Sequence, residues 1–429
     1  MKPPISFKSI SLFLALVFSS STCLYPLDVY LKLTSKGEKI NIGLINFNSI
    51  AANTVGTELA RKIQDVLKTD LLFSRYFNVT SMNAVFTGKK EEFDYFRNQF
   101  TDVILTGSLS SDKSGRALNI KLFNVESGEL MFEKVFQDSG GDYRSLAHSA
   151  NDEIILRFTG QKGMAHTKIV FVNDSTGSKE ICKIDYDGYN LKRLTEDNSI
   201  NLFPKWSPDG GKVAFTTYKY GNPDLYIMNS NGSNRKAVST YQGLNISPTW
   251  SNDGNSMALT VSKGKSPNIY IENLNGQILK RLTHSNGIDS SPCFSPNNRE
   301  IAFISDRAGI PQLYICDNEG ANVRRVITEG YSDSPSWSPK GDKIAFAMRF
   351  GGESFFNIYL YDIASDKAVS LTGGQGSNES PSFSPDGRFI VFSSTRNGKK
   401  ELFIICVDGS GEHRLADIKK NSQMPHWSP

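Results

Sequence analysis

Carboxylates recur at one position of a repeated short phrase. Asp209, Asp253 and Asp386 each stand between Ser-Pro or Ser-Asn and a glycine. Two neighbouring carboxylates can share general acid and general base roles, so the repetition first suggests acid–base catalysis. Each aspartate nevertheless belongs to a separate copy of one turn, in which Pro presets a backbone angle and Gly tolerates positive ones. We interpret the three as turn formers, not as a catalytic pair.

The five histidines show no spacing that metal or catalytic sites use. They are His148, His166, His284, His413 and His426. The sequence contains no His-Glu-x-x-His frame, no Gly-x-Ser-x-Gly nucleophile elbow and no Walker phosphate loop. We therefore expect each histidine to be a surface or packed residue, and we predict no catalytic residue, no cofactor and no metal site.

Length and composition narrow the class of protein. The 429 residues allow two to four domains of roughly 100–200 residues each. The formal charge is only +4, from 48 Lys and Arg against 44 Asp and Glu, which gives little reason to expect a nucleic-acid or anionic-membrane partner. With 35 Gly and 17 Pro, the composition fits a turn-rich globular protein dominated by strands.

The N-terminus has the order of a secretory signal peptide. Lys2 and Lys8 precede an apolar run at 10–18, and small residues follow at 19–22. The run is too short for the roughly 20 residues that span a bilayer. We therefore predict a cleaved signal over 1–25, with a buried N-terminal helix as the alternative, and an exported protein that does not span the membrane.

The cysteines are scattered. They are Cys23, Cys182, Cys293, Cys316 and Cys406. None has a close partner that would suggest a metal knuckle. Cys23 could carry a lipid, but the residues before it make a poor lipoprotein pattern. An exported protein could oxidise the others, yet the repeat described next places three of them on equivalent strands of different units. We expect buried free thiols.

An aromatic anchor recurs after proline at a nearly constant interval. The anchors are Trp206, Trp250, Phe294, Trp337, Phe383 and Trp427, separated by 44, 44, 43, 46 and 44 residues. A period of about 40–50 residues built of strands indicates propeller blades. The anchors could instead form a ring that stacks on a ligand, but their identical positions favour packing between blades.

One repeat accounts for four antiparallel strands. Trp337 lies in a short inner strand, and Ser-Pro-Lys-Gly at 338–341 forms a turn. Apolar, β-prone residues at 343–348 and 357–361 predict the second and third strands, and 368–372 predicts the outer strand. This is the composition of one propeller blade.

The chain ends must share a blade. Six anchors are present, but only five precede a complete set of strands. The missing three strands lie upstream, at 168–172, 181–185 and 191–195, so we expect Trp427 to pair beside the first of them. This closure removes the exposed edges that invite aggregation. We predict a six-bladed propeller over 164–429.

The segment before the ring lacks the repeat and forms a separate domain. Helical spacing of apolar residues at 54–72 and 143–158 alternates with strand patterns at 39–47, 102–109, 117–125 and 130–136. We predict an α/β domain over 39–163, with the junction at 160–163. The complete fold is then an α/β N-terminal domain followed by an all-β six-bladed β-propeller with a composite closing blade.

The chain resembles the TolB family, the periplasmic propeller component of the Tol–Pal envelope system. The resemblance rests on Asp-Tyr-Asp-Gly-Tyr-Asn at 185–190, Pro-His-Trp-Ser-Pro at 425–429, and the phrase from Ala147-His148 to Gly160-Gln161-Lys162-Gly163. It implies a monomeric, non-enzymatic adaptor in the periplasm, peripheral to the membranes, that supports outer-membrane integrity and cell division. Its implied partners are the lipoprotein Pal and the inner-membrane protein TolA.

The resemblance also assigns a role to the segment at 26–38. Val29, Leu31 and Leu33 alternate as in a strand, and the family contacts TolA through such a segment. An exchangeable strand could pair with a partner strand or with its own protein.

Geometry narrows the Pal site. The residues just before the repeated prolines lie where outer strands connect to inner strands, at one mouth of the central channel. Loops at such a mouth carry binding while the ring stays rigid. From these residues we expect the Pal contacts to be Asn245, Ile246, Asp289, Ser290, Asp333, Glu379, Gln423 and Met424.

Two other classes of propeller are alternatives. An exported enzyme, such as a lyase or peptidase, would need a metal or a cluster of bases in the channel, and no such set stands out. A carbohydrate-binding propeller would favour exposed aromatic residues at the mouth, and the residues assigned to the mouth include none.

Overall fold

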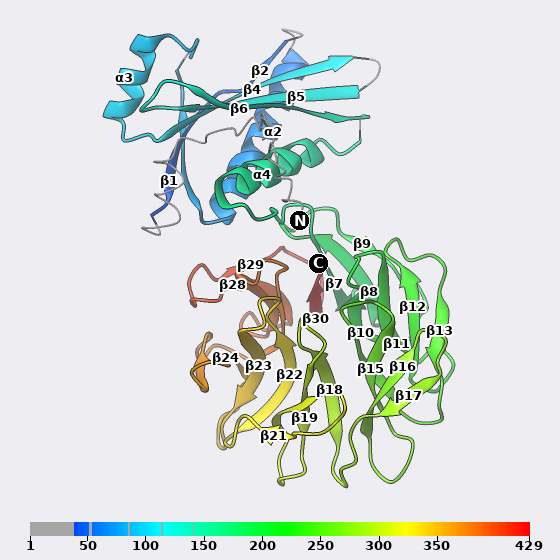
Figure 1. The fold of residues 1–429 in the computed structure, drawn as a ribbon. Coiled ribbons are helices and arrows are strands. Elements are labelled where there is room, and N and C mark those ends of the chain that lie inside the picture. Colours follow the sequence, from blue (N-terminus) through cyan, green and yellow to red (C-terminus); the bar gives the residue numbers. More distant parts are fainter. Residues whose placement is uncertain (1–37, 51–53, 85, 113–114, 140) are drawn as a thin grey trace, which may run out of the picture. The chain divides into compact units, whose positions relative to one another are not determined.

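The computed structural model describes residues 38–429 apart from 51–53, 85, 113–114 and 140 (Figure 1). The predicted signal peptide, Cys23 and the segment with Val29, Leu31 and Leu33 lie outside the described residues. The chain divides into two compact units, one ending at Gly163 and the other spanning Met164–Pro429.

The first unit is a mixed α/β domain. Its described elements are β1 (Ile40–Ile45), β2 (Asn48–Ser49), α2 (Thr54–Phe73), β3 (Phe77–Met82), α3 (Lys90–Asn98), β4 (Val103–Asp112), β5 (Gly115–Asn124), β6 (Leu130–Asp138) and α4 (Arg144–Thr159). The sheet order is β3-β1-β4-β5-β6, with β2 paired to β4. Strand β1 runs parallel to both neighbours, whereas β4, β5 and β6 are antiparallel.

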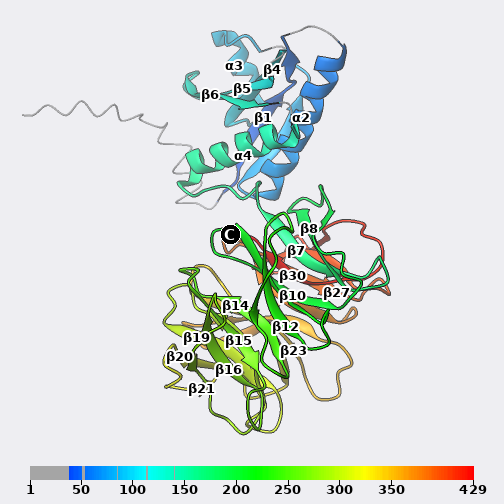
Figure 2. The same cartoon turned by 90° about the vertical axis from the view of Figure 1, so that its right-hand side faces the viewer.

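Helices α2 and α4 pack together against the sheet (Figure 2). Ile63, Leu67 and Leu71 recur at helical spacing and are fully buried, as expected for the apolar face of an amphipathic helix. The two helices are also joined by a buried contact of 2.7 Å between His148 Nδ1 and an Asp70 carboxylate oxygen. The expected helices and strands of this domain are therefore present.

Three elements of this unit, β2, β3 and α3, did not stand out from the sequence. Strand β2 has only two residues, β3 carries polar residues at three of its six positions, and α3 is only nine residues long. Helix α3 begins with a capping box in which the Glu92 carboxylate accepts the backbone N–H of Lys89. Phe93 and Phe96 bury its apolar side against the sheet.

The second unit contains, within the described residues, six four-stranded antiparallel sheets. Five are continuous in sequence: β10 (Asn201–Trp206) to β13, β14 (Asn245–Trp250) to β17, β18 (Asp289–Phe294) to β21, β22 (Tyr331–Trp337) to β25, and β26 (Asn378–Phe383) to β29. Their second strands are β11 (Lys212–Thr217), β15 (Ser256–Val261), β19 (Glu300–Ser305), β23 (Lys343–Arg349) and β27 (Phe389–Ser394). Their third strands are β12 (Asp224–Asn229), β16 (Asn268–Asn273), β20 (Gln312–Asp317), β24 (Asn357–Asp362) and β28 (Glu401–Cys406). Their outer strands are β13 (Lys236–Ser239), β17 (Ile278–Arg281), β21 (Arg324–Arg325), β25 (Lys367–Ser370) and β29 (His413–Arg414).

The sixth blade joins the two ends of the propeller and confirms the predicted closure. Its strand order is β30-β7-β8-β9, from β30 (Ser422–Trp427), β7 (Lys168–Asn173), β8 (Glu180–Asp185) and β9 (Lys192–Arg193). Trp427 lies opposite Ile169 in the antiparallel pair β30–β7 (Figure 1). The Trp427 indole N–H also donates to Thr167 Oγ1 at 2.9 Å. The six-bladed propeller with a composite blade is thus confirmed.

The aromatic anchors fill the spaces between blades. Trp250 packs against Ala214 and Leu225 of the preceding blade, and Trp337 packs against Ala302 in the same way. Phe383 is equally buried, against Ala345. The anchors therefore serve as core residues, as their identical positions suggested.

None of the helices within the described residues combines the length and the apolar character that crossing a bilayer requires.

One buried carboxylate stands where the other blades have no acid. Glu272 is fully buried opposite Met257 in the second blade. The equivalent residues are Ile184, Met228, Cys316, Tyr361 and Ile405. Ser239 Oγ lies 3.1 Å from one Glu272 oxygen and shares its one proton between that oxygen and Asn245 Oδ1, and the other Glu272 oxygen has no hydrogen-bond partner among the described residues. Burial raises the pKa of Glu272 to about 7, and Ser239 and Lys263 oppose the rise only in part.

We expect the difference in stability between Glu272→Gln and the wild type to favour the variant more at pH 8 than at pH 5. In the wild type, the raised pKa lets the native state hold a proton that the unfolded chain releases. The contribution of Glu272 to the free energy of unfolding is therefore fully present below about pH 4.5 and is lost as the pH rises through about 7. The gain between the two pH values should be roughly 1–3 kcal/mol in the free energy of unfolding. Urea denaturation at both pH values measures it. Glu319→Gln, at an exposed acid, is the control, and an equal effect at both pH values would contradict the assignment.

Removal of residues 422–429 should expose β7 as an unpaired edge. We expect faster amide hydrogen exchange along β7 and self-association in light scattering, because an open edge can pair with another chain. Trp427→Ala should lower the free energy of unfolding by about 3–5 kcal/mol and also expose β7. Trp337→Ala, in a blade that needs no closure, should cost a similar free energy but leave β7 protected. Unchanged exchange in β7 after the deletion would contradict the closure.

Candidate functional site

Every inner strand of the propeller carries the same irregularity near its start. In β10, Asn201 and Leu202 pair with β11, the register then shifts, and pairing resumes at Lys205. A proline sits in the gap, where its missing N–H breaks no ladder bond. The residue before each proline is left-handed: Phe203 (φ 53°), Ser247 (52°), Ser291 (53°), Ser334 (51°), Ser380 (55°) and Met424 (52°). This bulge separates the first two residues of each strand, at the mouth, from the residues that line the channel below.

The residue three positions before each proline, which we call the first residue, is buried in its own blade; it opens every inner strand except β22, which begins one residue earlier at Tyr331. These residues are Asn201, Asn245, Asp289, Ser332, Asn378 and Ser422. The Asp289 carboxylate accepts two bonds of 3.0 Å from Arg307 Nη2. The Asn245 amide donates to the Tyr241 carbonyl at 2.6 Å and accepts from Ser239 Oγ at 2.9 Å. Asn245 and Asp289, both expected at the Pal contact, are therefore placed where they fasten loops and not at the surface.

The residue two positions before each proline, which we call the second residue, reaches the mouth. Ile246, Ser290, Glu379 and Gln423 are partly exposed, and Asp333 is exposed. Met424, at the bulge, is partly exposed and packs against the core around Trp206. The accessible part of the expected site is thus a mixed apolar and acidic surface formed by these second residues and Met424.

Asp333 and Glu379 give the mouth its negative charge. Loss of hydration between the walls of the mouth raises the pKa of Asp333, the Ser334 amide opposes this at 2.7 Å, and the Glu379 charge raises it further. Glu379 accepts from Lys400 Nζ at 2.7 Å and from Ser377 Oγ at 2.7 Å. A cationic group from a partner would relieve the repulsion between the two acids.

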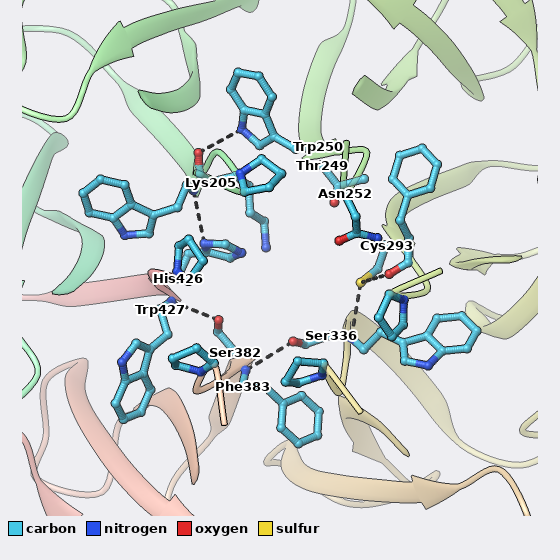
Figure 3. Close-up of a pocket in the computed structure, with 18 of the residues that line it drawn as sticks. Lys205, Thr249, Trp250, Asn252, Cys293, Ser336, Ser382, Phe383, His426 and Trp427 are labelled. Atoms are coloured by element: carbon cyan, nitrogen blue, oxygen red, sulfur yellow. Dashed lines mark hydrogen bonds between the residues drawn. The ribbon is translucent and has the colours of Figure 1, made fainter. Parts of the chain in front are cut away.

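Below the mouth the channel narrows and then widens. The left-handed residues and the prolines surround a space of only about 50 Å³. Beyond them lies a cavity of about 310 Å³ lined by residues of all six inner strands (Figure 3). The ring between prolines and aromatic anchors consists of Lys205, Thr249, Cys293, Ser336, Ser382 and His426. Sequence analysis did not select this ring, although the constant spacing from proline to anchor could have located it.

The repeated aspartates are turn formers, as interpreted from the sequence. Asp209 accepts from Ser207 Oγ at 2.5 Å and from the Gly211 amide at 2.9 Å. Asp253 and Asp386 make the same contacts in their blades. Where the phrase departs from this pattern, Asn297 accepts from Ser295, and Asp342 replaces the acid missing at Lys340 by accepting from Ser338.

Three of the described cysteines lie on the third strands of three different blades, in β8, β20 and β28. Cys182 and Cys316 are buried free thiols, as expected, and Cys406 is buried as well, while Cys293 is free and partly exposed to the channel. Burial raises the pKa of Cys182 and of Cys316 to about 12, so neither is a reactive thiolate.

The histidines are equally dispersed. His148 is buried in the α/β unit, and His426 lines the channel. The other three, His166, His284 and His413, are exposed.

Comparison with known proteins gives a consistent result. The family described as the TolB beta propeller domain matches residues 156–429. The "Tol-Pal system protein TolB" of Geobacter metallireducens is 35% identical over 161 residues, which is 36% of this chain and 38% of that protein. The protein of the same name from Desulfosudis oleivorans is 34% identical over 218 residues, 48% of this chain and 50% of that protein. The matches therefore span about two fifths to one half of the length of these relatives.

A solved structure resembles most of the chain. The crystal structure of TolB from Acinetobacter baumannii superposes with a TM-score of 0.80 at 26% sequence identity. The superposition covers 91% of this chain and 97% of that one. The likeness therefore extends beyond the propeller repeat, which many unrelated proteins share.

Proposed function

This chain belongs to the TolB β-propeller family, and from that premise we propose that it is a non-enzymatic, monomeric adaptor of the Tol–Pal system in the periplasm. It binds the lipoprotein Pal at the channel mouth and TolA through residues 26–38. Through these contacts it supports outer-membrane integrity and cell division. The relatives named above are Tol–Pal system proteins, and the mouth is the observation that carries the proposal for this chain.

The mouth suits a protein partner because a rigid ring presents it. Its six strands are anchored by buried first residues, such as Asp289 with Arg307 and Asn378 with Arg396. The exposed second residues then need little ordering on binding, which lowers the entropic cost of association. The Pal contact is carried by Ile246, Ser290, Asp333, Glu379, Gln423 and Met424, while Asn245 and Asp289 support it from within their blades.

The apolar and acidic residues of the mouth also indicate which partner surface would be complementary to it. The apolar residues Ile246 and Met424 and the acids Asp333 and Glu379 all belong to the irregular starts of inner strands, which form the mouth. A complementary surface on Pal offers a basic side chain beside an apolar one, because like charges across an interface are strongly disfavoured.

Reversal of both mouth acids, Asp333→Lys with Glu379→Lys, should weaken Pal binding about tenfold or more, since a basic partner would then meet a basic mouth. Thermal stability should change little, because the Glu379–Lys400 pair is about one-third exposed and contributes little to folding. Calorimetry with lipid-free Pal measures the affinity. The matched control, Glu300→Lys with Glu319→Lys, reverses two acids at the opposite ends of the strands and should bind normally. Equal affinity in both double variants would remove the mouth from the proposal.

The N-terminal segment makes the second contact of the proposal. If Val29, Leu31 and Leu33 form an exchangeable strand, TolA can add its own strand beside them. Coupling of the two partners requires that each prefer a different state of this segment.

Deletion of residues 26–36 should abolish TolA binding, because the alternating apolar residues are lost. It should also alter Pal affinity if the two contacts are coupled. Pull-down with purified TolA and calorimetry with Pal test the two statements separately. Retained TolA binding would reject the segment as the contact, whereas unchanged Pal affinity would reject only the coupling.

A further inference from the structure

The ring beneath the prolines forms a belt of hydrogen bonds between blades. In four blades the side chain of the ring residue accepts a hydrogen bond from the backbone N–H of the aromatic anchor in the next blade. The bonds are Trp337 N–H to Cys293 Sγ (3.2 Å), Phe383 N–H to Ser336 Oγ (3.4 Å), Trp427 N–H to Ser382 Oγ (3.1 Å) and Trp206 N–H to His426 Nδ1 (3.2 Å). Because these side chains accept hydrogen bonds in the belt, their own protons are not used there and can be donated to another group.

The protons that remain are available to the cavity. A hydroxyl that accepts a bond still has its own O–H to donate. Within the described residues, the hydroxyls of Ser336 and Ser382 have no acceptor. His426 must leave Nδ1 unprotonated to accept from Trp206, so its neutral ring carries the proton on Nε2. Burial, together with the Lys205 charge, lowers the pKa of His426 well below its ordinary value, which keeps the ring neutral.

Lys205 departs from the belt because an ammonium cannot accept. Its side chain instead extends into the open centre of the ring (Figure 3). Within the described part of the chain its ammonium has no carboxylate partner and no hydrogen-bond acceptor, although its backbone carbonyl accepts from the Trp250 indole at 3.2 Å. Burial lowers the pKa of Lys205, so a negatively charged ligand would restore the favourable charged state.

No aspartate or glutamate is among the residues that line this cavity. The lining side chains are therefore rich in donors and include one cation, the Lys205 ammonium, that has no ion-pair partner among the described residues. Such a set of side chains suits an anion better than a cation. We propose that the cavity binds a small oxyanion, held by the Lys205 ammonium and by donors from Ser336, Ser382 and His426. The shared chemistry is a compact group with several acceptor oxygens, either free phosphate or a carboxylate.

The exposed acids of the proposed Pal contact do not line this cavity. Lys205, Pro292 and Pro335 line both the cavity and the narrow space above it, and the other end of the cavity is lined by the prolines of the Ser-Pro turns, Pro208, Pro339 and Pro385. Loss of one function by substitution should therefore leave the other measurable.

Titration calorimetry of the full chain with inorganic phosphate, and separately with acetate, tests the proposal at constant ionic strength. We expect saturable binding of one anion per chain, and the tighter of the two ligands identifies the source. Lys205→Met should weaken it about tenfold or more, as loss of a buried charge-assisted bond does, whereas Lys205→Arg should keep most of the affinity. Lys236→Met, at a lysine of an outer strand, should bind as wild type does.

Ser336→Ala provides a second variant in case Lys205→Met does not fold. It loses only a long bond of 3.4 Å, so the propeller should remain folded while the anion affinity falls severalfold. The proposal is overturned if the wild-type chain binds neither anion saturably. It is equally overturned if the folded Lys205 and Ser336 variants bind as tightly as wild type.

Discussion

The pairing of β30 with β7 is the contact on which the rest of the propeller depends. It is reinforced at both ends, by Ser428 and Lys168 at one and by Asn421 and Asp174 at the other. The pairing completes the sixth four-stranded sheet, so the ring closes and only short, protected strand edges remain. Because the mouth and the cavity are both built from residues of all six inner strands, their geometry exists only while this seam is closed.

Because of the bulge before each proline, one inner strand contributes residues both to the channel mouth and to the cavity below it. A non-glycine residue in the left-handed region costs about 1–2 kcal/mol, yet the conformation recurs in every blade. The bulge divides the inner strand into a mouth portion and a lumen portion. The same backbone can therefore carry acids at the mouth, such as Asp333, and a lysine in the lumen, Lys205, without the two charges sharing one site.

Periodic features of the chain were predictable, and contacts across the repeat were not. The anchor spacing determines the number of blades, and the missing strands upstream of Asn201 require closure by Trp427. The burial of Asn245 and Asp289 depends on partners in other strands, Tyr241 and Arg307, which spacing does not reveal. Helix α3 escaped notice because nine residues give too short a pattern. The belt of hydrogen bonds likewise joins residues of neighbouring blades. They lie 44 to 47 positions apart in three bonds and 220 apart in the bond between Trp206 and His426, and only the ring geometry establishes their pairing.

Departures from the repeat are informative because every blade offers the same backbone environment. Glu272 occupies a position that is not acidic in the other blades, and its burial opposes the charged form. Lys205 occupies a ring position where the seryl residues of two other blades complete the belt, so a serine there would satisfy the fold at less cost. A sequence that violates the local rule of its fold usually does so at a functional site. For Glu272 the violation affects only the pH dependence of stability, since its side chain is sealed between blades. For Lys205 the ammonium faces an open cavity without a counter-ion, which is why binding is argued from the lysine and not from the glutamate.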